Sequence, residues 1–148
     1  MKKRGFEVVT KYLNSSIDLP ARKTSGSAGY DFSAAETISI PAKKIVFVPT
    51  GIKAYMQKDE VLQMYPRSSL SLKKNLVKAN SVGIIDSDYY NNPDNEGEIK
   101  LILYNFGEKE VVINKGDRVA QGIFTKYLSV DNDENNVKRL GGFGSTGN

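Results

Sequence analysis

The segment EIKLILYNF (98–106) carries the clearest structural signal in this chain of 148 residues. Its apolar side chains divide between the two faces of an extended strand, with Ile99, Leu101 and Leu103 on one face and Ile102, Tyr104 and Phe106 on the other. Apolar residues on both faces are typical of a strand that is buried on both sides. We therefore expect this strand to lie in the core and to contribute to a contact between subunits.

Shorter runs with the same character occur on both sides of this segment: FEVVTKYL (6–13), TISI (37–40), KIVFVPTGIKAYM (44–56), VLQMY (61–65), VGII (82–85), EVVI (110–113) and RVAQGIF (118–124). Turn residues separate them, and this spacing predicts an all-β sandwich or barrel. One short helix is expected over 68–74, where Ser68 or Ser69 could cap it. The polar stretch DNDENNVK (131–138) reads as a linker. We expect a β domain over 1–130, then a linker and flexible C-terminal arm over 131–148.

Composition excludes several kinds of chemistry. The chain has no cysteine and no histidine, so proton transfer would fall to a carboxylate, Lys, Tyr or a metal-bound water, and deamination by a zinc site is excluded. The 21 basic and 17 acidic residues give a net charge of +4 without a basic block. This pattern suits a small anionic ligand better than direct binding of nucleic acid. Glu7 and Lys11 interrupt any signal peptide, and we expect a cytoplasmic protein without membrane contact.

Two segments in the first half could hold an anion or a metal. SAGYDFSAAE (27–36) places Asp31 at the beginning of a strand, although a turn with a solvated Asp explains this segment more simply. PRSSLSLKK (66–74) combines Arg67 with Ser68 and Ser69 at a helix N-terminus. An ordinary helix cap explains the second segment equally well.

The segment NSVGIIDSDYY (80–90) could read a base. Asn80, the VGII strand and the return strand from Glu98 predict a hairpin whose backbone edge offers donors and acceptors. Asp86 is the leading candidate for activating water because the chain has no histidine. Tyr89 could offer its ring to a sugar, whereas Asp88 is consistent with a solvated side chain. A decorated hairpin loop is the simpler explanation of this segment taken alone.

Two further segments lie near the C-terminal end. In KGDRVAQGIF (115–124), Gln121 occupies an otherwise apolar strand and therefore needs a polar partner. Asp117 and Arg118 in the same segment fit a turn or an ion pair. RLGGFGSTGN (139–148) contains Phe143 among glycines. It is either a frayed terminus or a lid that closes over phosphates.

Five of these segments resemble, in order, the five motifs of the trimeric deoxyuridine triphosphatases, the dUTPases. The segments are SAGYDF, PRSSLS, NSVGIIDSDYY, GDRVAQ and GGFGSTG. The resemblance implies a β jelly roll and a homotrimer, with the arm of one subunit lying over a site formed by the other two. It also implies Mg²⁺-dependent hydrolysis of dUTP to dUMP and pyrophosphate, which limits uracil in DNA and supplies dUMP for thymidylate synthesis.

The resemblance also implies a role for each matching residue. Asp31 would hold the water shell of Mg²⁺, and Asp86 would activate the water that attacks the α-phosphorus. Tyr89 would pack under the deoxyribose, and Phe143 would stack on uracil. The phosphates would be bound by Arg67, Ser68, Ser69, Gln121, Arg139, Ser145 and Thr146. Uracil would be read by Asn80, by the backbone of Gly83, Ile84, Ile85 and Asp86, and by the main chain near Lys100, with Gly144 in the closing arm.

The sequence departs from the family pattern at two places. The residues YNNPDNE, which begin with Tyr90 and end with Glu96, are interposed before the return strand. Arg139 also stands one residue closer to Phe143 than is usual, which bears on its reach to the γ-phosphate.

Two other functions fit parts of this pattern. A dCTP deaminase, or its bifunctional relative that yields dUMP, shares the implied fold, but Asp86 and the GFGSTG arm favour the hydrolase. A regulatory protein could use the scaffold to bind a protein partner through the interposed residues. The intact set of motifs favours retained catalysis in that case too.

Overall fold

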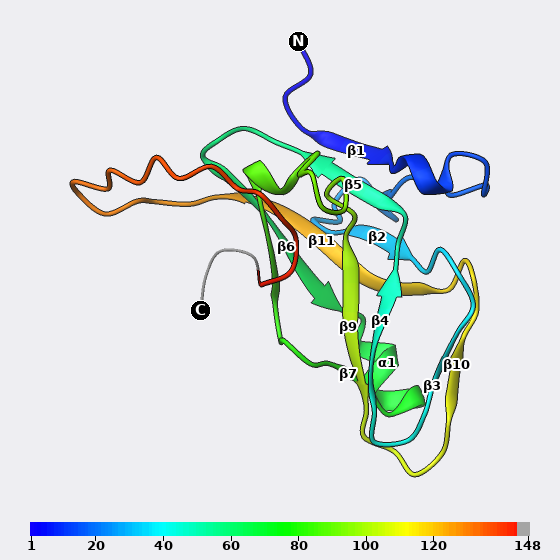
Figure 1. Ribbon diagram of the computed structural model, residues 1–148. Helices are drawn as coiled ribbons and strands as arrows, with labels where there is room; N and C mark the ends of the chain where they lie inside the picture. Colours follow the sequence, from blue (N-terminus) through cyan, green and yellow to red (C-terminus); the bar gives the residue numbers. More distant parts are fainter. Residues whose placement is uncertain (145–148) are drawn as a thin grey trace.

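The computed structural model describes residues 1–144, and within this range the chain is mostly β (Figure 1). The strands are β1 (Gly5–Val8), β2 (Tyr30–Ser33), β3 (Ile38–Ile40), β4 (Ile45–Pro49), β5 (Ile52–Tyr55), β6 (Glu60–Pro66), β7 (Leu76–Lys78), β8 (Gly83–Asp86), β9 (Lys100–Asn105), β10 (Val111–Ile113) and β11 (Arg118–Lys126). The helix α1 spans Ser68–Lys74, and the 3-10 turns η1 and η2 span Thr10–Tyr12 and Ser87–Tyr89. The predicted all-β class with one short helix is confirmed.

Two sheets enclose the core. One has the strand order β2-β11-β6-β8, and the other has the order β4-β9-β7. Phe32 and Leu62 of the first sheet belong to the same buried cluster as Val48, Leu101 and Leu103 of the second. Burial of this apolar surface between the sheets is the main force that holds them together. Two smaller antiparallel pairs, β1 with β5 and β10 with β3, extend the structure.

Strand β9 is buried on one face rather than on both. Leu101 and Leu103 are fully buried, as predicted, whereas Ile102 and Tyr104 are half-buried. The register places Ile102 opposite Phe47 of β4, a residue that is 48% exposed. The prediction of burial on both sides is therefore wrong for the single chain. The second face keeps an apolar surface that a partner could cover.

The predicted hairpin between the VGII strand and the return strand is also wrong. Strand β8 pairs with β6, whereas β9 lies between β4 and β7 in the other sheet. One face of β9 is buried in the core, and β9 lies in the centre of that sheet. Strand β8 is therefore an edge strand, and its backbone groups on the side away from β6 take no part in this sheet.

Several element boundaries differ from the predictions for local reasons. The segment 44–56 forms two strands because the chain turns at Gly51, which has a φ of +70° that favours glycine. The segment 6–13 leaves the strand after Val8 and enters η1. Arg67, with an extended backbone, is the N-cap of α1 and forms no side-chain cap bond. Ser68 and Ser69 lie inside the helix, so the predicted serine cap is wrong.

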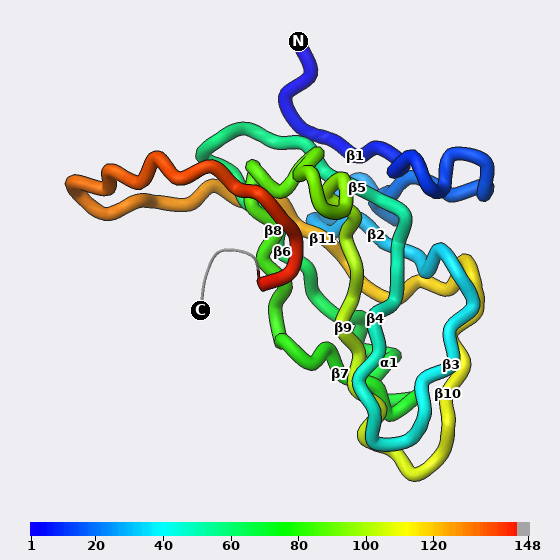
Figure 2. The backbone as a smooth tube through the Cα atoms, in the orientation of Figure 1, coloured from blue at the N-terminus to red at the C-terminus, as the bar shows by residue number. Residues whose placement is uncertain are grey.

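The chain after β11 runs out and back beside the sheets, as the orange and red parts of the tube show (Figure 2). Residues 126–138 are exposed, whereas Arg139, Gly141 and Gly142 are wholly or partly buried again. The predicted division at residue 130 stays a prediction. Within residues 1–144, no helix is long and apolar enough to cross a membrane.

Candidate functional site

A cavity of about 200 Å³ gathers most of the residues predicted to bind a base and sugar. It lies where the edge strand β8, the end of β7 and the start of β9 meet the returning C-terminal segment. The predicted residues that line it are Asn80, Gly83, Ile84, Ile85, Asp86, Tyr89, Lys100, Arg139, Phe143 and Gly144. Met64, Lys78 and Gly142 complete the lining. Residues from widely separated segments of the sequence thus share one concave surface.

Asp86 stands at the end of β8, where its carboxylate is half exposed. Arg139 Nη2 donates to Asp86 Oδ2 at 2.5 Å, and Arg139 Nε donates to Asp88 Oδ1 at 2.7 Å. Asp88, which the sequence left as a solvated side chain, is therefore a partner of the arm. The planar guanidinium bridges two carboxylates that would otherwise repel each other.

Tyr89 forms a rigid wall of the cavity. Its ring is buried, its hydroxyl donates to the Glu98 carbonyl at 2.9 Å, and Asn95 Nδ2 donates to that hydroxyl at 2.8 Å. Burial raises the pKa of Tyr89, so the phenol is neutral at pH 7. Phe143 lies edge-on to Phe47 at 5.3 Å and to Tyr89 at 6.3 Å between ring centroids. Tyr89 and Phe143 thus give the cavity an apolar side.

Lys78 is a member of this cavity that the motifs did not indicate. It is 7% exposed, and its Nζ donates to Asn80 Oδ1 at 2.5 Å. Burial lowers its pKa to about 8. The sequence signal was a lysine two residues after the buried Leu76, since alternate residues of a strand face the same way.

A second cavity, of about 250 Å³, gathers the residues predicted to bind phosphate and metal. Asp31, Arg67, Ser68 and Gln121 line it together with Lys23, Ser27, Gly29 and Arg118. Three cationic side chains around one carboxylate suit a polyanionic ligand. Lys23 and Arg118 were not predicted as site residues.

Gly29 lies against the side chain of Gln121 in this cavity. A Cβ at position 29 would collide with Oε1 of Gln121 in its present position, so a larger residue there would displace this amide. Strand pairing puts Gln121 opposite Asp31. Arg118 Nη1 bonds to Asp31 Oδ2 at 3.2 Å, whereas Asp117 pairs with Lys74 at 3.6 Å. Asp117 and Arg118 are thus paired with other residues and not with each other.

The donor set around Asp31 fits one kind of metal site. Within the described residues, no group of three or more acidic side chains could enclose a metal ion directly. A single carboxylate near phosphate-binding cations instead suits Mg²⁺ that keeps its water shell and is held mainly by substrate phosphates. The residues present are therefore compatible with the predicted water-mediated role of Asp31.

The two cavities lie at different places along strand β6. Asp86 pairs with Val61 near the start of β6, whereas Arg67 follows its last residue, Pro66. The six residue-to-residue steps from 61 to 67 correspond to about 20 Å of extended chain. Within one chain, the candidate base and the phosphate-binding arginine are therefore far apart.

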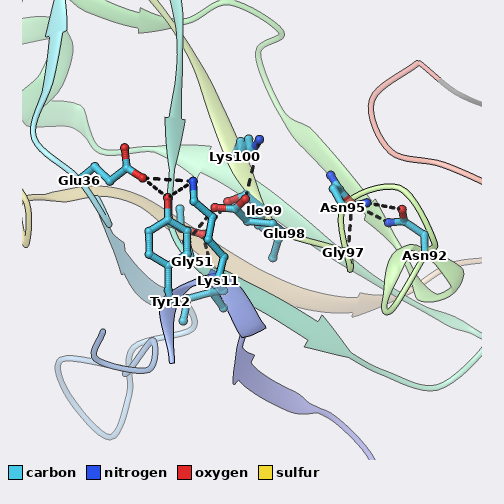
Figure 3. A network of polar contacts seen from close by, with 12 residues as sticks. Lys11, Tyr12, Glu36, Gly51, Asn92, Asn95, Gly97, Glu98, Ile99 and Lys100 are labelled. Carbon is cyan, nitrogen blue, oxygen red and sulfur yellow. Dashed lines mark hydrogen bonds and ion pairs between the residues drawn. The ribbon is translucent and has the colours of Figure 1, made fainter. Parts of the chain in front are cut away.

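The interposed residues (90–96, the extension) form an ordered part of the fold. Asn92 and Asn95 hold its turn, and Glu98 next to it is buried beside Gly51 and Lys100 (Figure 3). Burial raises the pKa of the Glu98 carboxyl. Asp94 Oδ2 accepts a hydrogen bond from Gly142 N at 3.3 Å, so the extension also touches the returning arm. A role of this surface in binding a protein partner stays a prediction.

Some predicted residues lie elsewhere. Ser69 is half-buried on α1 and lines neither of the two cavities. Ser145 and Thr146 lie outside the described residues. A larger open groove of about 650 Å³ lies beside Lys74, Phe106 and Lys109. It contains none of the predicted site residues, and its charged groups are at the surface, so the two smaller cavities are the better candidates.

The chain is similar to several known proteins. A family model described as dUTPase matches residues 15–147. The chain is 60% identical over 149 residues to a deoxyuridine 5'-triphosphate nucleotidohydrolase of Lactococcus lactis subsp. lactis (strain IL1403), with 99% of each chain covered. The crystal structure of a dUTPase from Streptococcus mutans is 51% identical, with a TM-score of 0.83 over 86% of this chain and 98% of that one. A dUTPase from phage phi11 of S. aureus, described with a structural Mg(II) ion, is 18% identical, with a TM-score of 0.74 over 92% of this chain and 98% of that one.

Proposed function

The chain belongs to the dUTPase family and hydrolyses dUTP to dUMP and pyrophosphate, and on this premise we propose how its residues divide the work. The cavity beside β8 receives the uracil and deoxyribose, and the cavity around Asp31 receives the phosphates of the same reaction. The full-length relatives are dUTP hydrolases, which supports hydrolysis over deamination. The main support for this proposal is that most of the residues predicted from the five motifs line one of these two cavities.

The base is read by an edge strand. Because β8 pairs with β6 on one side only, the backbone of Gly83 to Asp86 retains donors and acceptors for a uracil edge. Asn80 stands at the rim of the same cavity, and Phe143 supplies a ring that can stack on the base. Tyr89, fixed by its two hydrogen bonds, packs against the deoxyribose and leaves no room for a 2′-hydroxyl.

Asp86 takes the proton of the attacking water. The water oxygen forms a bond to the α-phosphorus while the bond to the bridging oxygen breaks, and pyrophosphate leaves. Asp86 is the carboxylate at the edge of the base cavity, and the chain has no histidine to replace it. Arg139 must release Asp86 before this step. We infer that the substrate's γ-phosphate competes for the guanidinium and draws it away from both carboxylates.

The phosphates bind to Arg67, Ser68 and Gln121, with further cationic support from Lys23 and Arg118. Asp31 would hold a hydrated Mg²⁺, and this cation would neutralise charge on the leaving pyrophosphate. Ser69, Ser145 and Thr146 complete the proposed set through the resemblance alone.

Each active site requires more than one subunit in this proposal. The α-phosphorus, which must meet the water at Asp86, is covalently linked to the phosphates that Arg67 binds. Asp86 and Arg67 of one chain are separated by about 20 Å along β6, so they cannot both contact the same triphosphate. A second copy of the chain must therefore supply the phosphate cavity, which supports a homo-oligomer, and the family resemblance implies that this oligomer is a trimer. The apolar face around Phe47 and Ile102 is available for such a contact.

Substitution of the base tests the catalytic assignment. Asp86→Asn should lower kcat by about two to four orders of magnitude, because a positioned general base is worth that much. The substitution preserves size, so dUTP should still bind, and binding is measured by calorimetry while pyrophosphate release gives kcat. Asp133→Asn, on the exposed segment before the arm, is the matched control. Near-normal turnover of Asp86→Asn would remove Asp86 from the mechanism.

A further inference from the structure

Lys78 is unusual because its charge is buried at a ligand cavity. It is 7% exposed and lies on the inward face of β7 with Leu76, which is fully buried. Its Nζ lines the base cavity and lies 2.8 Å from the place where a Cβ at Gly83 would stand. A glycine at this position of β8 thus leaves space for the ammonium group.

Burial of this ammonium group is not compensated by an ion pair. In the part of the chain that the structure describes, burial is the cause that shifts the Lys78 pKa, and no ion pair with a carboxylate is formed. Asp86, Tyr89, Lys100 and Arg139 are the other titratable groups that line the cavity. A methionine or leucine would fill the same space without desolvating a charge. The lysine is therefore better explained by its hydrogen bond than by packing.

That hydrogen bond fixes the direction of the Asn80 side chain. An ammonium group has three donors and no acceptor, so it can contact only the Oδ1 end of the carboxamide. The Nδ2 end then remains for a ligand in the cavity. An amide NH₂ group donates to a carbonyl oxygen and repels an amino group, which is the difference between uracil and cytosine at position 4 of the ring.

We propose that Lys78 is a specificity-determining positioning residue: it holds the Asn80 oxygen so that the Asn80 amide NH₂ faces the base and selects uracil over cytosine. This inference rests on the proposed place of Asn80 in the base cavity. Lys78 acts through Asn80 and need not touch the reacting atoms. Its contribution therefore belongs to nucleotide binding and not to the hydrolytic step.

The test measures kcat and KM for dUTP, and the inhibition constant of dCTP, for the full-length enzyme with Mg²⁺. Lys78→Met removes the donors at nearly constant volume. The ratio of the dCTP inhibition constant to the dUTP KM should fall about tenfold to a hundredfold, because a misdirected amide no longer rejects the wrong partner. The change should appear in KM, with kcat within about threefold of the unmodified enzyme.

Two further variants make the result specific to the donor. Lys78→Arg keeps a cationic donor and should retain a higher ratio than Lys78→Met. Lys44→Met, an exposed lysine outside both cavities, should leave the ratio unchanged. Thermal unfolding of each variant confirms that it is folded.

Asn80→Ala separates the inference from the proposal on which it rests. If Asn80→Ala raises the KM for dUTP while Lys78→Met leaves the ratio within twofold, Lys78 has no part in specificity. A uniform loss of kcat in Lys78→Met without a change in the ratio would also overturn the inference. If Asn80→Ala itself changes neither KM nor the ratio, the proposed base cavity is wrong.

Discussion

At the scale of single residues, the buried charge of Lys78 gives a measurable pH dependence. Burial holds the pKa of Lys78 at about 8 in the folded chain, whereas an unfolded lysine has a pKa of about 10.4. Between these values the unfolded chain binds more protons, so the penalty of burying the charge is present below pH 8 and disappears as the pH rises. The residue therefore destabilises the fold at neutral pH and not at alkaline pH.

We predict that Lys78→Met unfolds at a higher temperature than the unmodified protein at pH 7, by several degrees. The difference in Tm should shrink toward zero near pH 10. Asp86, Tyr89, Lys100 and Arg139 line the same cavity and are unchanged in the variant, so their contributions largely cancel in the difference. Differential scanning calorimetry at one protein concentration measures both values. A lower Tm for Lys78→Met at pH 7 would show that the lysine stabilises the fold.

Single residues also show what a sequence can and cannot reveal. Asp86, Tyr89 and Phe143 were identified from motifs, and the structure places them at one cavity. Lys78 and Arg118 were missed as site residues because they lie outside or beside the recognised positions, and their roles come from contacts between distant strands. Such contacts depend on strand pairing, which residue spacing does not determine.

At the scale of elements, the extension shows how an interposed segment becomes part of the fold. Asn92 is 5% exposed. Its Nδ2 donates to the Tyr89 carbonyl and to Asn95 Oδ1, each at 2.8 Å. Its Oδ1 accepts from the backbone N–H groups of Asp94 and Asn95, each at 3.1 Å. One side chain thus supplies acceptors for two backbone N–H groups of the turn, in addition to the backbone hydrogen bonds formed by Asn92 N and Glu96 N.

Asn92→Ala should lower the free energy of unfolding by about 1–3 kcal/mol, because the N–H groups of Asp94 and Asn95 lose their acceptor and a buried side chain is removed. Urea denaturation at a fixed protein concentration measures the loss. Asn136→Ala, at an exposed position of the linker, should change stability by less than about 0.5 kcal/mol. Equal stability of the two variants would mean that the extension is not held by Asn92.

Strand pairing was the element-scale feature that the sequence predicted least well. Periodicity located most strands, including β9, and turn residues located the breaks between them. Periodicity gave no means of choosing a partner for β8, and the prediction wrongly paired β8 with β9, the strand that follows it in the sequence. The partner of β8 is set by the fit of Ile85 into the core between both sheets, which is a property of the three-dimensional arrangement.

At the scale of the whole molecule, the two cavities that we propose as halves of an active site do not meet within one chain. The base cavity holds Asp86, and the phosphate cavity holds Arg67, about 20 Å away along β6. The sequence predicted the family, the fold class and most of the residues in both halves, because five motifs recur in order. The sequence did not predict the distance between the two cavities, because that distance depends on how β8 pairs along β6.

Mixed trimers test this composite site most directly. Chains carrying Asp86→Asn and chains carrying Arg67→Ala should each be nearly inactive alone. When the two are unfolded, mixed in equal amounts and refolded together, about a quarter of the sites should combine an intact Asp86 from one chain with an intact Arg67 from another. If the site is shared between chains, pyrophosphate release from dUTP should recover toward a quarter of the unmodified rate. Activity no greater than that of the two variants refolded separately would contradict it.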